Sequence, residues 1–432
     1  MPHFTLRLAA DEPISAAEAA SSFYWLTNHA RSSFVSSVDP YLSELGPVPP
    51  RNIDLVRIAL TALAADRSVH RAGRGSNWNQ RHFELEIPVS DPEPWTQTAP
   101  ALEHVLAFLS GDRWALSFVP QPGPVPLAAE TPPTPPPARV VLLSGGADSA
   151  LGAVRSRRQL ADDEHHVLLS HFSNTMLPPI QRHIAAEAMR LIPGGTQQHH
   201  IVHLSRHTHR IDGTVYPSEP TTRSRSLLFI ALGLAVASLH HVPLWIPENG
   251  FASLNPPLGP ERLGSLSTRT THPAFLQDLS AAATAAGAHA VIENPFARHT
   301  KGEIFQQAAS LLGTEEASTF LSSSHSCGLT GQRTYSIPAK RQCGVCFGCV
   351  LRRASFTAAS LHDRTDYIAP SSDAAVQNWL GRNSVEQPVR NLLRRGIRNR
   401  DLIALDLPHT YPLREARDLC ARGLKDLRSL YP

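Results

Sequence analysis

The stretch from Val140 to Leu151, VVLLSGGADSAL, constrains the fold of this chain more than any other. Four apolar residues end at Ser144, two glycines follow, and a pattern typical of a helix begins near Asp148. This order predicts a buried parallel strand, a tight turn and a helix start. Gly145 and Gly146 allow the backbone to turn sharply and to approach a ligand closely. Because amides at a helix N-terminus bind anions, we expect a phosphate-binding loop here.

Three polar side chains accompany this loop. Ser144 and Ser149 place hydroxyl groups at its two ends, while Asp148 carries a carboxylate that would repel a phosphate. A Mg²⁺ ion between Asp148 and a leaving pyrophosphate would explain that carboxylate. The lysine of a GxxxxGK[ST] motif is absent, so the loop is not of the Walker type. A glycine-rich strand-to-helix turn without a ligand is the alternative interpretation.

The motif SGGxDS after an apolar strand resembles the pyrophosphate loop of the PP-loop ATP pyrophosphatases. Those enzymes split ATP between the α and β phosphates and adenylate an oxygen of the substrate. The resemblance implies an ATP-binding loop made of Ser144, Gly145, Gly146, Ala147, Asp148 and Ser149.

The chain divides into four regions by composition. Residues 1–119 mix strand and helix patterns, and residues 120–137 contain nine prolines and read as a semi-rigid polyproline spacer. Residues 138–365 alternate strands with helices, which is typical of a doubly wound parallel sheet. Residues 366–432 have leucines at helical spacing with arginines between them. We therefore expect an α/β protein with a separate N-terminal α+β domain and a helical C-terminal tail that offers a packing or partner surface.

Composition narrows the classes of partner. The formal net charge is only +3 over 432 residues, so we expect no nucleic-acid partner. No apolar run reaches membrane-spanning length, and the first residues carry charge and proline where a signal peptide would be apolar. Four of the five cysteines lie close together in the sequence, which favours a metal site in a reducing cytoplasm over a disulfide framework.

The N-terminal region offers no catalytic constellation. Its patterns predict strands at 4–8, 83–89 and 114–119, and helices at 15–27, 52–65 and 102–109. Five polar or aromatic residues near the end of the second helix form either a polar site or, as we favour, an ordinary salt-bridge cluster: Asp66, Arg67, Arg71, Trp78 and Arg81.

Ligands of an open α/β sheet bind at the carboxyl ends of its strands. The second strand of the nucleotide domain, at 166–172, therefore places Ser170 and Phe172 near an adenosine, together with the residues up to Asn174. A long apolar helix begins after Arg223, Ser224 and Arg225, where a cation meets nucleotide phosphates, unless these residues are a helix cap with solvated arginines. Lys301 precedes another helix and contacts a phosphate or a developing oxyanion, unless it is a plain surface lysine.

A long polar segment follows the fourth strand of this domain. It runs from Glu248 to Pro273, contains glycine and proline, and has almost no apolar content at its start. Such a segment inside a compact domain is usually functional or disordered, and we favour a substrate-binding loop. Its candidate substrate-binding residues are Glu248, Asn249, Asn255 and His272.

Cysteines 343, 346 and 349 form CGVCFGC, and Cys327 precedes them. Four thiolates at this spacing suit a closed, tetrahedral structural zinc site. An iron–sulfur cluster is the alternative, and the isolated Cys420 reads as a small core residue. The histidines between 199 and 209 do not match a tetrahedral set, so we expect most of them at the surface.

SGGADS together with Cys327 and CGVCFGCVLRR resembles the 7-cyano-7-deazaguanine synthase (QueC) family over about residues 139–360. The resemblance implies a PP-loop fold of the adenine nucleotide alpha hydrolase type, a zinc site at Cys327, Cys343, Cys346 and Cys349, and a role for Lys301, whose context HTKGEIF is similar to the family's. It also implies ATP-dependent conversion of 7-carboxy-7-deazaguanine and ammonia to an amide and then a nitrile. The family's acidic base-recognition segment is replaced here by ENGFASLNPPL, which leaves the base open.

The first 120 residues and the tail after about 365 are absent from usual family members. The longer architecture resembles the QueC-like proteins of bacterial anti-phage defence systems (the Qat type). That resemblance implies the same carboxylate activation with another acceptor, an amine of a partner protein. A nucleotide-sensing scaffold and a tRNA-modifying thiolase are the competing hypotheses; the intact Asp148 argues against the first, and the single cysteine outside the cluster argues against the second.

Overall fold

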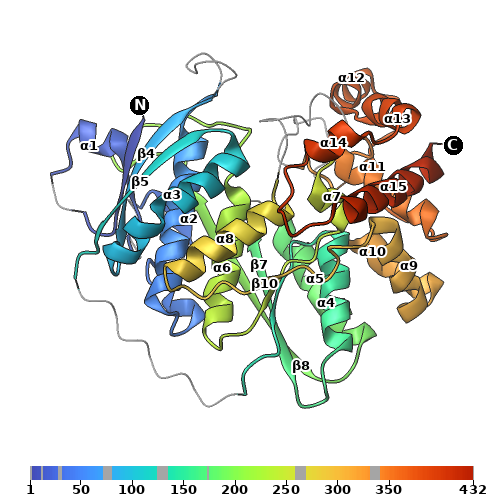
Figure 1. The fold of residues 1–432 in the computed structure, drawn as a ribbon, viewed down its shortest axis with the longest axis horizontal. Coiled ribbons are helices and arrows are strands. Elements are labelled where there is room, and N and C mark those ends of the chain that lie inside the picture. Colours follow the sequence, from blue (N-terminus) through green and yellow to red (C-terminus); the bar gives the residue numbers. More distant parts are fainter. Residues whose placement is uncertain are drawn as a thin grey trace.

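The computed structural model describes residues 2–10, 13–27, 32–71, 80–123, 135–172, 175–257, 269–330 and 341–431. It is an α/β structure with two parallel sheets and a helical C-terminal region (Figure 1). This confirms the α/β class, the parallel sheet and the helical tail that the sequence predicts. Most of the proline-rich spacer, together with Trp78, Asn174 and residues 258–268, lies outside the described residues.

The first sheet has four strands in the order β2-β1-β4-β5, all parallel to their neighbours. Its elements in chain order are β1 (His3–Arg7), α1 (Ala16–Ser21), β2 (Ser22–Tyr24), α2 (Pro50–Ser68), β4 (His82–Val89), α3 (Pro92–Ser110) and β5 (Arg113–Pro120). The helix expected over 15–27 ends at Ser21, because Ser22–Tyr24 pairs with β1 as a strand. Phe23 and Tyr24 are both buried there, and aromatic residues suit a strand.

The second sheet has six strands in the order β10-β9-β6-β7-β8-β3. Its parallel strands are β6 (Val140–Leu142), β7 (His165–Phe172), β8 (Thr196–Arg206), β9 (Leu244–Trp245) and β10 (Ile292–Glu293). Four helices connect them: α4 (Ala147–Arg158), α5 (Leu177–Leu191), α6 (Arg225–Ser238) and α8 (Pro273–Ala285). Alternate residues face two different cores, since Val140 packs in the core with α6 and Val141 in the core with α4 and α5. Helices therefore cover both faces of this sheet.

The N-terminal region shares its core with the second sheet, although the sequence suggests a separate domain. Strand β3 (Phe34–Ser36) pairs antiparallel with the edge strand β8. Helix α2 packs against α6, and α3 packs against α8. One hydrophobic cluster runs from Phe4 through these helices to Val202 and Leu244. The first 119 residues are thus continuous in packing with the nucleotide region.

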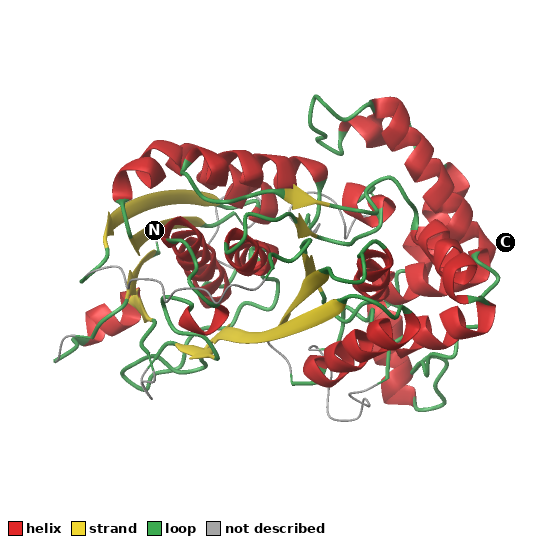
Figure 2. Cartoon of the chain, turned by 90° about the horizontal axis from the view of Figure 1, so that it is seen from below, coloured by secondary structure: helices red, strands yellow, loops and turns green. Residues whose placement is uncertain are grey.

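The C-terminal half of the chain adds a block of helices beside the strands (Figure 2). These are α7 (Gly250–Leu254), α9 (Lys301–Leu312), α10 (Thr314–Ser323), α11 (Phe347–Ala358), α12 (Ala374–Asn383), α13 (Glu386–Arg395), α14 (Asn399–Ile403) and α15 (Leu413–Leu430). Helix α15 contacts α7, α9 and α11, so the tail is packed onto the region that carries Lys301 and the cysteines. Within the part of the chain that the structure describes, none of the helices has the length and apolar character that crossing a membrane requires.

Candidate active site

The loop between β6 and α4 is closed by its own hydroxyl groups. Gly145 has φ +90°, a conformation that favours glycine, and Gly146 is the extended residue before the helix. The Ser149 hydroxyl donates to the Gly146 carbonyl at 2.9 Å and lies 3.0 Å from the Ser144 hydroxyl oxygen. The main chain of His325 donates to the Gly145 carbonyl at 2.8 Å, which ties the loop to the segment after α10. The turn therefore has its shape before any ligand binds.

Four side chains that the sequence singles out meet beside the loop. Lys301 Nζ lies 3.0 Å from Asp148 Oδ1, and both side chains are buried. Asn249 Nδ2 donates to Asp148 Oδ2 at 2.8 Å and lies within 3.0 Å of Glu248 Oε1. Asp148 stands in the first turn of α4, Glu248 and Asn249 follow β9, and Lys301 is the first residue of α9. Three separate elements thus converge at the carboxyl edge of the sheet.

The position of Lys301 is fixed by the start of its helix. Thr300 and Glu303 form a capping box at the N-terminus of α9, and Asp426 of α15 accepts from the Gly302 amide at 3.0 Å. Only 6% of Lys301 is exposed, so it is not a plain surface lysine. The tail helix therefore takes part in holding the lysine that pairs with Asp148.

The two carboxyl groups of the site differ in charge state. Burial by itself would raise the pKa of Asp148, but the Lys301 charge and the hydrogen bonds from Glu248, Asn249 and Lys301 lower it to about 2. Burial, and then the charge of Asp148, raises the pKa of Glu248 well above its ordinary value. Asp148 is therefore the anion and Glu248 the proton carrier of the pair. This arrangement offers one negative charge and several oxygen ligands to a cation or a phosphate.

The loop and this constellation open into a cavity of about 1010 Å³. Its wall includes Ser144, Gly146, Ala147, Asp148, Ser149, Glu248, Asn249 and Lys301. It also includes residues of the N-terminal helix α2 and of the segment that carries Cys327. A cavity of this volume has room for a nucleotide and a second small molecule.

Five of the expected ligand-binding residues have other surroundings. Ser170 is buried and donates to the Leu143 carbonyl at 2.7 Å, and Phe172 stacks on His203 at 4.6 Å between ring centroids. The Arg223 amide donates to Asp66 of α2 at 2.8 Å. His272 caps α8 through Nδ1, and Asn255 is the left-handed residue that ends α7. Neither these residues nor Gly145 is part of the cavity wall in the described structure.

The four clustered cysteines form a possible metal centre. The ligand atoms of Cys327, Cys343, Cys346 and Cys349 all lie within 4.8 Å of one another, and all four side chains are buried. The amide of Cys346 donates to the Cys343 sulfur at 3.3 Å. Hydrogen bonds from the other three thiols lower the pKa of Cys327, so a thiolate forms readily there. This donor set fits a tetrahedral metal such as zinc.

The remaining cysteine and the histidines carry no comparable group. Cys420 is buried in the core formed with α15, and burial raises its pKa to about 12. No other set of three or more metal-binding side chains lies together among the residues that the structure describes. His199 and His200 are half-buried in β8, so the expectation of surface histidines is too simple.

Sequence reasoning missed the contribution of the N-terminal region to the cavity. Arg67 of α2, Arg206 of β8 and Arg225 of α6 are wall residues, whereas Arg223 is not. Arg67 precedes the loop by about eighty residues, and no local pattern marks it as a ligand-binding residue. Only the packing of α2 against α6 brings it to the cavity.

Comparison with known proteins adds no relative to this picture: no family model, no curated protein and no solved structure matches the chain. The features that bear on function are therefore the loop, the Asp148–Lys301 constellation, the cavity and the cysteine cluster.

Proposed function

We propose that this chain is an ATP-dependent carbon–nitrogen ligase of the QueC-like PP-loop class. It adenylates the carboxylate of a 7-deazaguanine, taken as 7-carboxy-7-deazaguanine, and passes the acyl group to a nitrogen nucleophile. The observation that carries this proposal is the buried Asp148–Lys301 pair, with Asn249 linking Asp148 to Glu248, beside a phosphate-sized loop. A glycine-rich turn without a ligand has no need of such a pair.

The residues at the loop fit a Mg²⁺ ion with ATP. Asp148 supplies carboxylate oxygens and Glu248 a neutral carboxyl group, and Asp148 Oδ1 is paired with Lys301 Nζ at 3.0 Å. When bound, Mg²⁺ neutralises charge on the leaving pyrophosphate. The amides of residues 145–149 hold the phosphates, and Lys301 supplies positive charge where the α-phosphate is attacked.

The proposed reaction has two steps. A carboxylate oxygen of the substrate attacks the α-phosphorus of ATP, the bond to the bridging oxygen breaks, and pyrophosphate leaves. A nitrogen nucleophile then attacks the acyl carbon of the acyl-adenylate, loses a proton and expels AMP, which leaves an amide. Both steps require positioning and charge stabilisation, and no covalent enzyme nucleophile is needed. This agrees with the burial of Cys420 outside the cavity.

The four cysteines hold a structural zinc ion in this proposal. The chain segment that contains Cys327 also contributes His325, whose amide donates to the loop, and Ser326, whose amide donates to Gln342 Oε1 at 2.9 Å. A metal at the cluster would fix this segment against the loop. The four thiol groups require a soft or borderline metal, for which zinc is the first choice.

An amine of a partner protein is the proposed acceptor, in an anti-phage defence role. Use of ammonia to form 7-cyano-7-deazaguanine is the first alternative. A nucleotide-sensing scaffold or a tRNA-modifying PP-loop protein is the second. The altered segment after Glu248 and the N-terminal wall of the cavity favour an acceptor or base other than those of the shorter enzymes.

Pyrophosphate release from Mg-ATP by the purified protein, with and without 7-carboxy-7-deazaguanine, tests the proposal. We expect release that depends on the deazaguanine and that falls at least about a hundredfold in Asp148→Asn, since the variant loses the charge that recruits the cation. Exposed Asp163→Asn is the matched control. Pyrophosphate release that does not depend on the deazaguanine would contradict the choice of that base. Undiminished release by Asp148→Asn would contradict the role of the loop carboxylate. Metal analysis that finds iron in place of zinc would favour the tRNA-modifying alternative.

A further inference from the structure

A second part of the cavity wall holds three arginines, which we call the arginine cluster. Arg67 is in the last turn of α2, Arg206 is the last residue of β8, and Arg225 is the first residue of α6. All three belong to the wall of the cavity that contains the phosphate loop. Helix α2 is distant in sequence from β8 and α6, so the packing of the fold brings the three arginines to the wall of one cavity.

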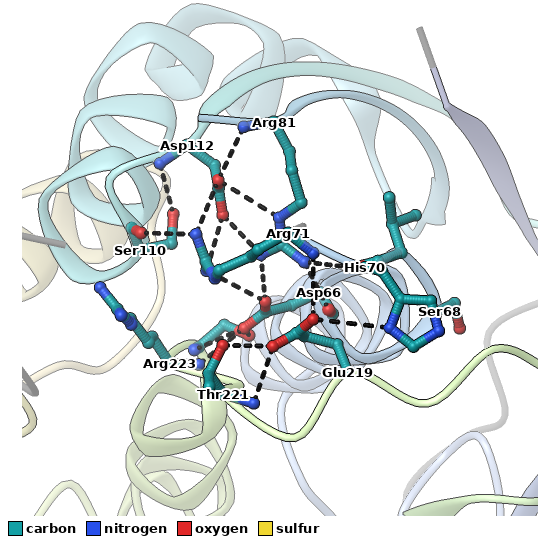
Figure 3. A network of polar contacts seen from close by, with 12 residues as sticks. Asp66, Ser68, His70, Arg71, Arg81, Ser110, Asp112, Glu219, Thr221 and Arg223 are labelled. Atoms are coloured by element: carbon teal, nitrogen blue, oxygen red, sulfur yellow. Dashed lines mark hydrogen bonds and ion pairs between the residues drawn. The ribbon is translucent and has the colours of Figure 1, made fainter. Parts of the chain in front are cut away.

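Carboxylates do not neutralise this cluster. Among the described residues, no ion pair involves Arg67, Arg206 or Arg225, whereas Arg71 and Arg81 each pair with Asp66 and Asp112. The nearest acidic side chains are occupied by a neighbouring network (Figure 3). Its three acids, Asp66, Asp112 and Glu219, are bound by Arg71 and Arg81, while Arg223 joins the network through its main-chain amide. The charge of the arginine cluster remains uncompensated.

Glu219 also reaches the cavity wall, but its carboxylate is already engaged. Its oxygens accept from the amide of Arg71 at 3.0 Å and from the amide of Thr221 at 2.9 Å. Glu219 therefore ties Thr221 to Arg71, as Figure 3 shows, and among the described residues it forms no ion pair with the cluster.

Arg206 is held in a fixed orientation at this wall. Only 8% of the residue is exposed, its guanidinium donates to the carbonyls of His207 at 2.9 Å and Pro217 at 3.0 Å, and it stacks on Tyr216. Its Nε is buried and has no hydrogen-bond partner among the residues that the structure describes. Burial, and then the charge of Arg67, lowers the pKa of Arg206 to about 10, which reflects the lack of an anion nearby. A buried and partly unpaired guanidinium is costly unless a ligand completes it.

We propose that the arginine cluster is an oxyanion-binding site, for a phosphate or a carboxylate group carried by a second ligand of the cavity. Guanidinium groups bind both kinds of oxyanion through paired N–H donors. The cavity wall also contains six apolar residues, Phe34, Leu60, Leu63, Ala64, Leu177 and Leu204. The ligand therefore has an apolar or flat body with an anionic end. That this ligand is the second one in the cavity rests on the proposed function, in which the loop holds ATP.

The N-terminal region makes this site possible. Asp66 accepts from the amides of Arg223 and Ser224 at 2.8 and 3.1 Å and from the Ser224 hydroxyl at 2.8 Å. A carboxylate from α2 thus caps the start of α6, where Arg225 stands. A chain without the first 119 residues would lack both Arg67 and this cap, so the oxyanion site is a property of the long architecture.

Isothermal titration of the full chain tests the proposal, with inorganic phosphate and acetate as separate probes in low salt. Each probe is titrated in the presence and absence of a saturating non-hydrolysable ATP analogue with Mg²⁺. We expect phosphate or acetate to bind with the analogue present and to bind about tenfold more weakly in Arg67→Gln or Arg225→Gln, because a charged hydrogen bond is lost. The tighter probe identifies the class of oxyanion. Arg113→Gln, at an exposed site on β5 outside the cavity, is the control.

The failures of this proposal and of the proposed function can be told apart. Displacement of the probe by the analogue would show that the arginines contact the nucleotide's own phosphates, and this would overturn the proposal. Equal binding by Arg67→Gln, Arg225→Gln and Arg113→Gln would overturn it as well. If the analogue does not bind at all while Arg67→Gln still weakens probe binding, the oxyanion site stands and the ATP site fails. Arg67 and Arg225 are less buried than Arg206, so we expect both variants to fold. Thermal unfolding of each variant checks this.

Discussion

Asp148 shows how strongly one buried carboxylate depends on its partners. Its negative charge persists because Lys301 and Asn249 offset the cost of burial. Removing one partner of such a pair leaves an uncompensated charge, whereas removing both leaves a neutral site. Measurements of the free energy of unfolding can therefore isolate the interaction between Asp148 and Lys301.

We expect Lys301→Met and Asp148→Asn each to destabilise the protein by about 3 kcal/mol, because each leaves one buried charge without its partner. The double variant should be less destabilised than the sum of the two by about 2 kcal/mol. Chemical denaturation of the four proteins of this cycle measures the coupling. Additive losses would mean that the two side chains, 3.0 Å apart, do not interact in solution.

His272, which the sequence suggests as a substrate-binding residue, caps helix α8 in the structure. It is 1% exposed, its Nδ1 accepts from the Ala274 amide at 3.2 Å, and its ring contacts Phe108. Burial, and then the charge of Arg269, lowers its pKa from 6.5 to about 4. The folded protein therefore holds His272 neutral at a pH where the unfolded chain protonates it.

The pKa shift of His272 has a consequence for stability. Because the unfolded chain binds the extra proton between pH 6.5 and about 4, the stability contributed by this site is present above pH 6.5 and is lost as the pH falls through that window. His272→Asn keeps a capping acceptor but cannot titrate. We expect the loss of stability between pH 7 and 4.5 to be smaller in this variant by about 2 kcal/mol. Urea unfolding at the two pH values measures it, with exposed His409→Asn as the control; an unchanged difference would contradict the assignment.

At the scale of elements, helix α4 approaches the end of β9 so closely that a glycine is required. A Cβ at Gly152 would lie 2.1 Å from Cγ of Pro247, in a rigid ring. Pro247 precedes Glu248, and α4 carries Asp148, so this contact sets the spacing of the two acidic residues. By contrast, a Cβ at Gly381 in α12 meets nothing within 4 Å.

Two glycine-to-alanine changes should thus have opposite signs. Gly152→Ala should destabilise by about 2 kcal/mol through overpacking. It should also lower pyrophosphate release, since α4 must move away from the strand end. Gly381→Ala should stabilise by about 0.5 kcal/mol, because alanine loses less backbone entropy in a helix. Thermal unfolding of both variants checks the pair, and a stabilised Gly152→Ala would show that the contact is looser than the structure has it.

At the scale of the whole molecule, the sequence predicts features that lie within one short stretch of chain. It does not predict contacts between segments that only packing brings together. The strand–loop–helix at Val140–Leu151 and the cysteine spacing each lie in short stretches, and the structure has both. The convergence of Lys301, Glu248 and Asn249 on Asp148 followed the rule of strand ends. Arg223 could not be told from Arg225 by sequence, because they lie two residues apart and only the fold decides which one reaches the cavity wall. The shared core also escaped prediction, since it depends on where α2 meets α6.

This shared core leads to a prediction about cooperativity. Asp66 joins the N-terminal region to α6 and also pairs with Arg71 and Arg81 within its own region, in the network of Figure 3. Asp66→Asn leaves these buried arginines with too little negative charge, so we expect a loss of about 3 kcal/mol. Because one hydrophobic cluster spans both sheets, tryptophan fluorescence and far-ultraviolet circular dichroism should report one coincident unfolding transition, in the variant as in the parent protein. Two separated transitions would instead restore the independent N-terminal domain that the sequence suggests, and would remove α2 as a fixed wall of the cavity.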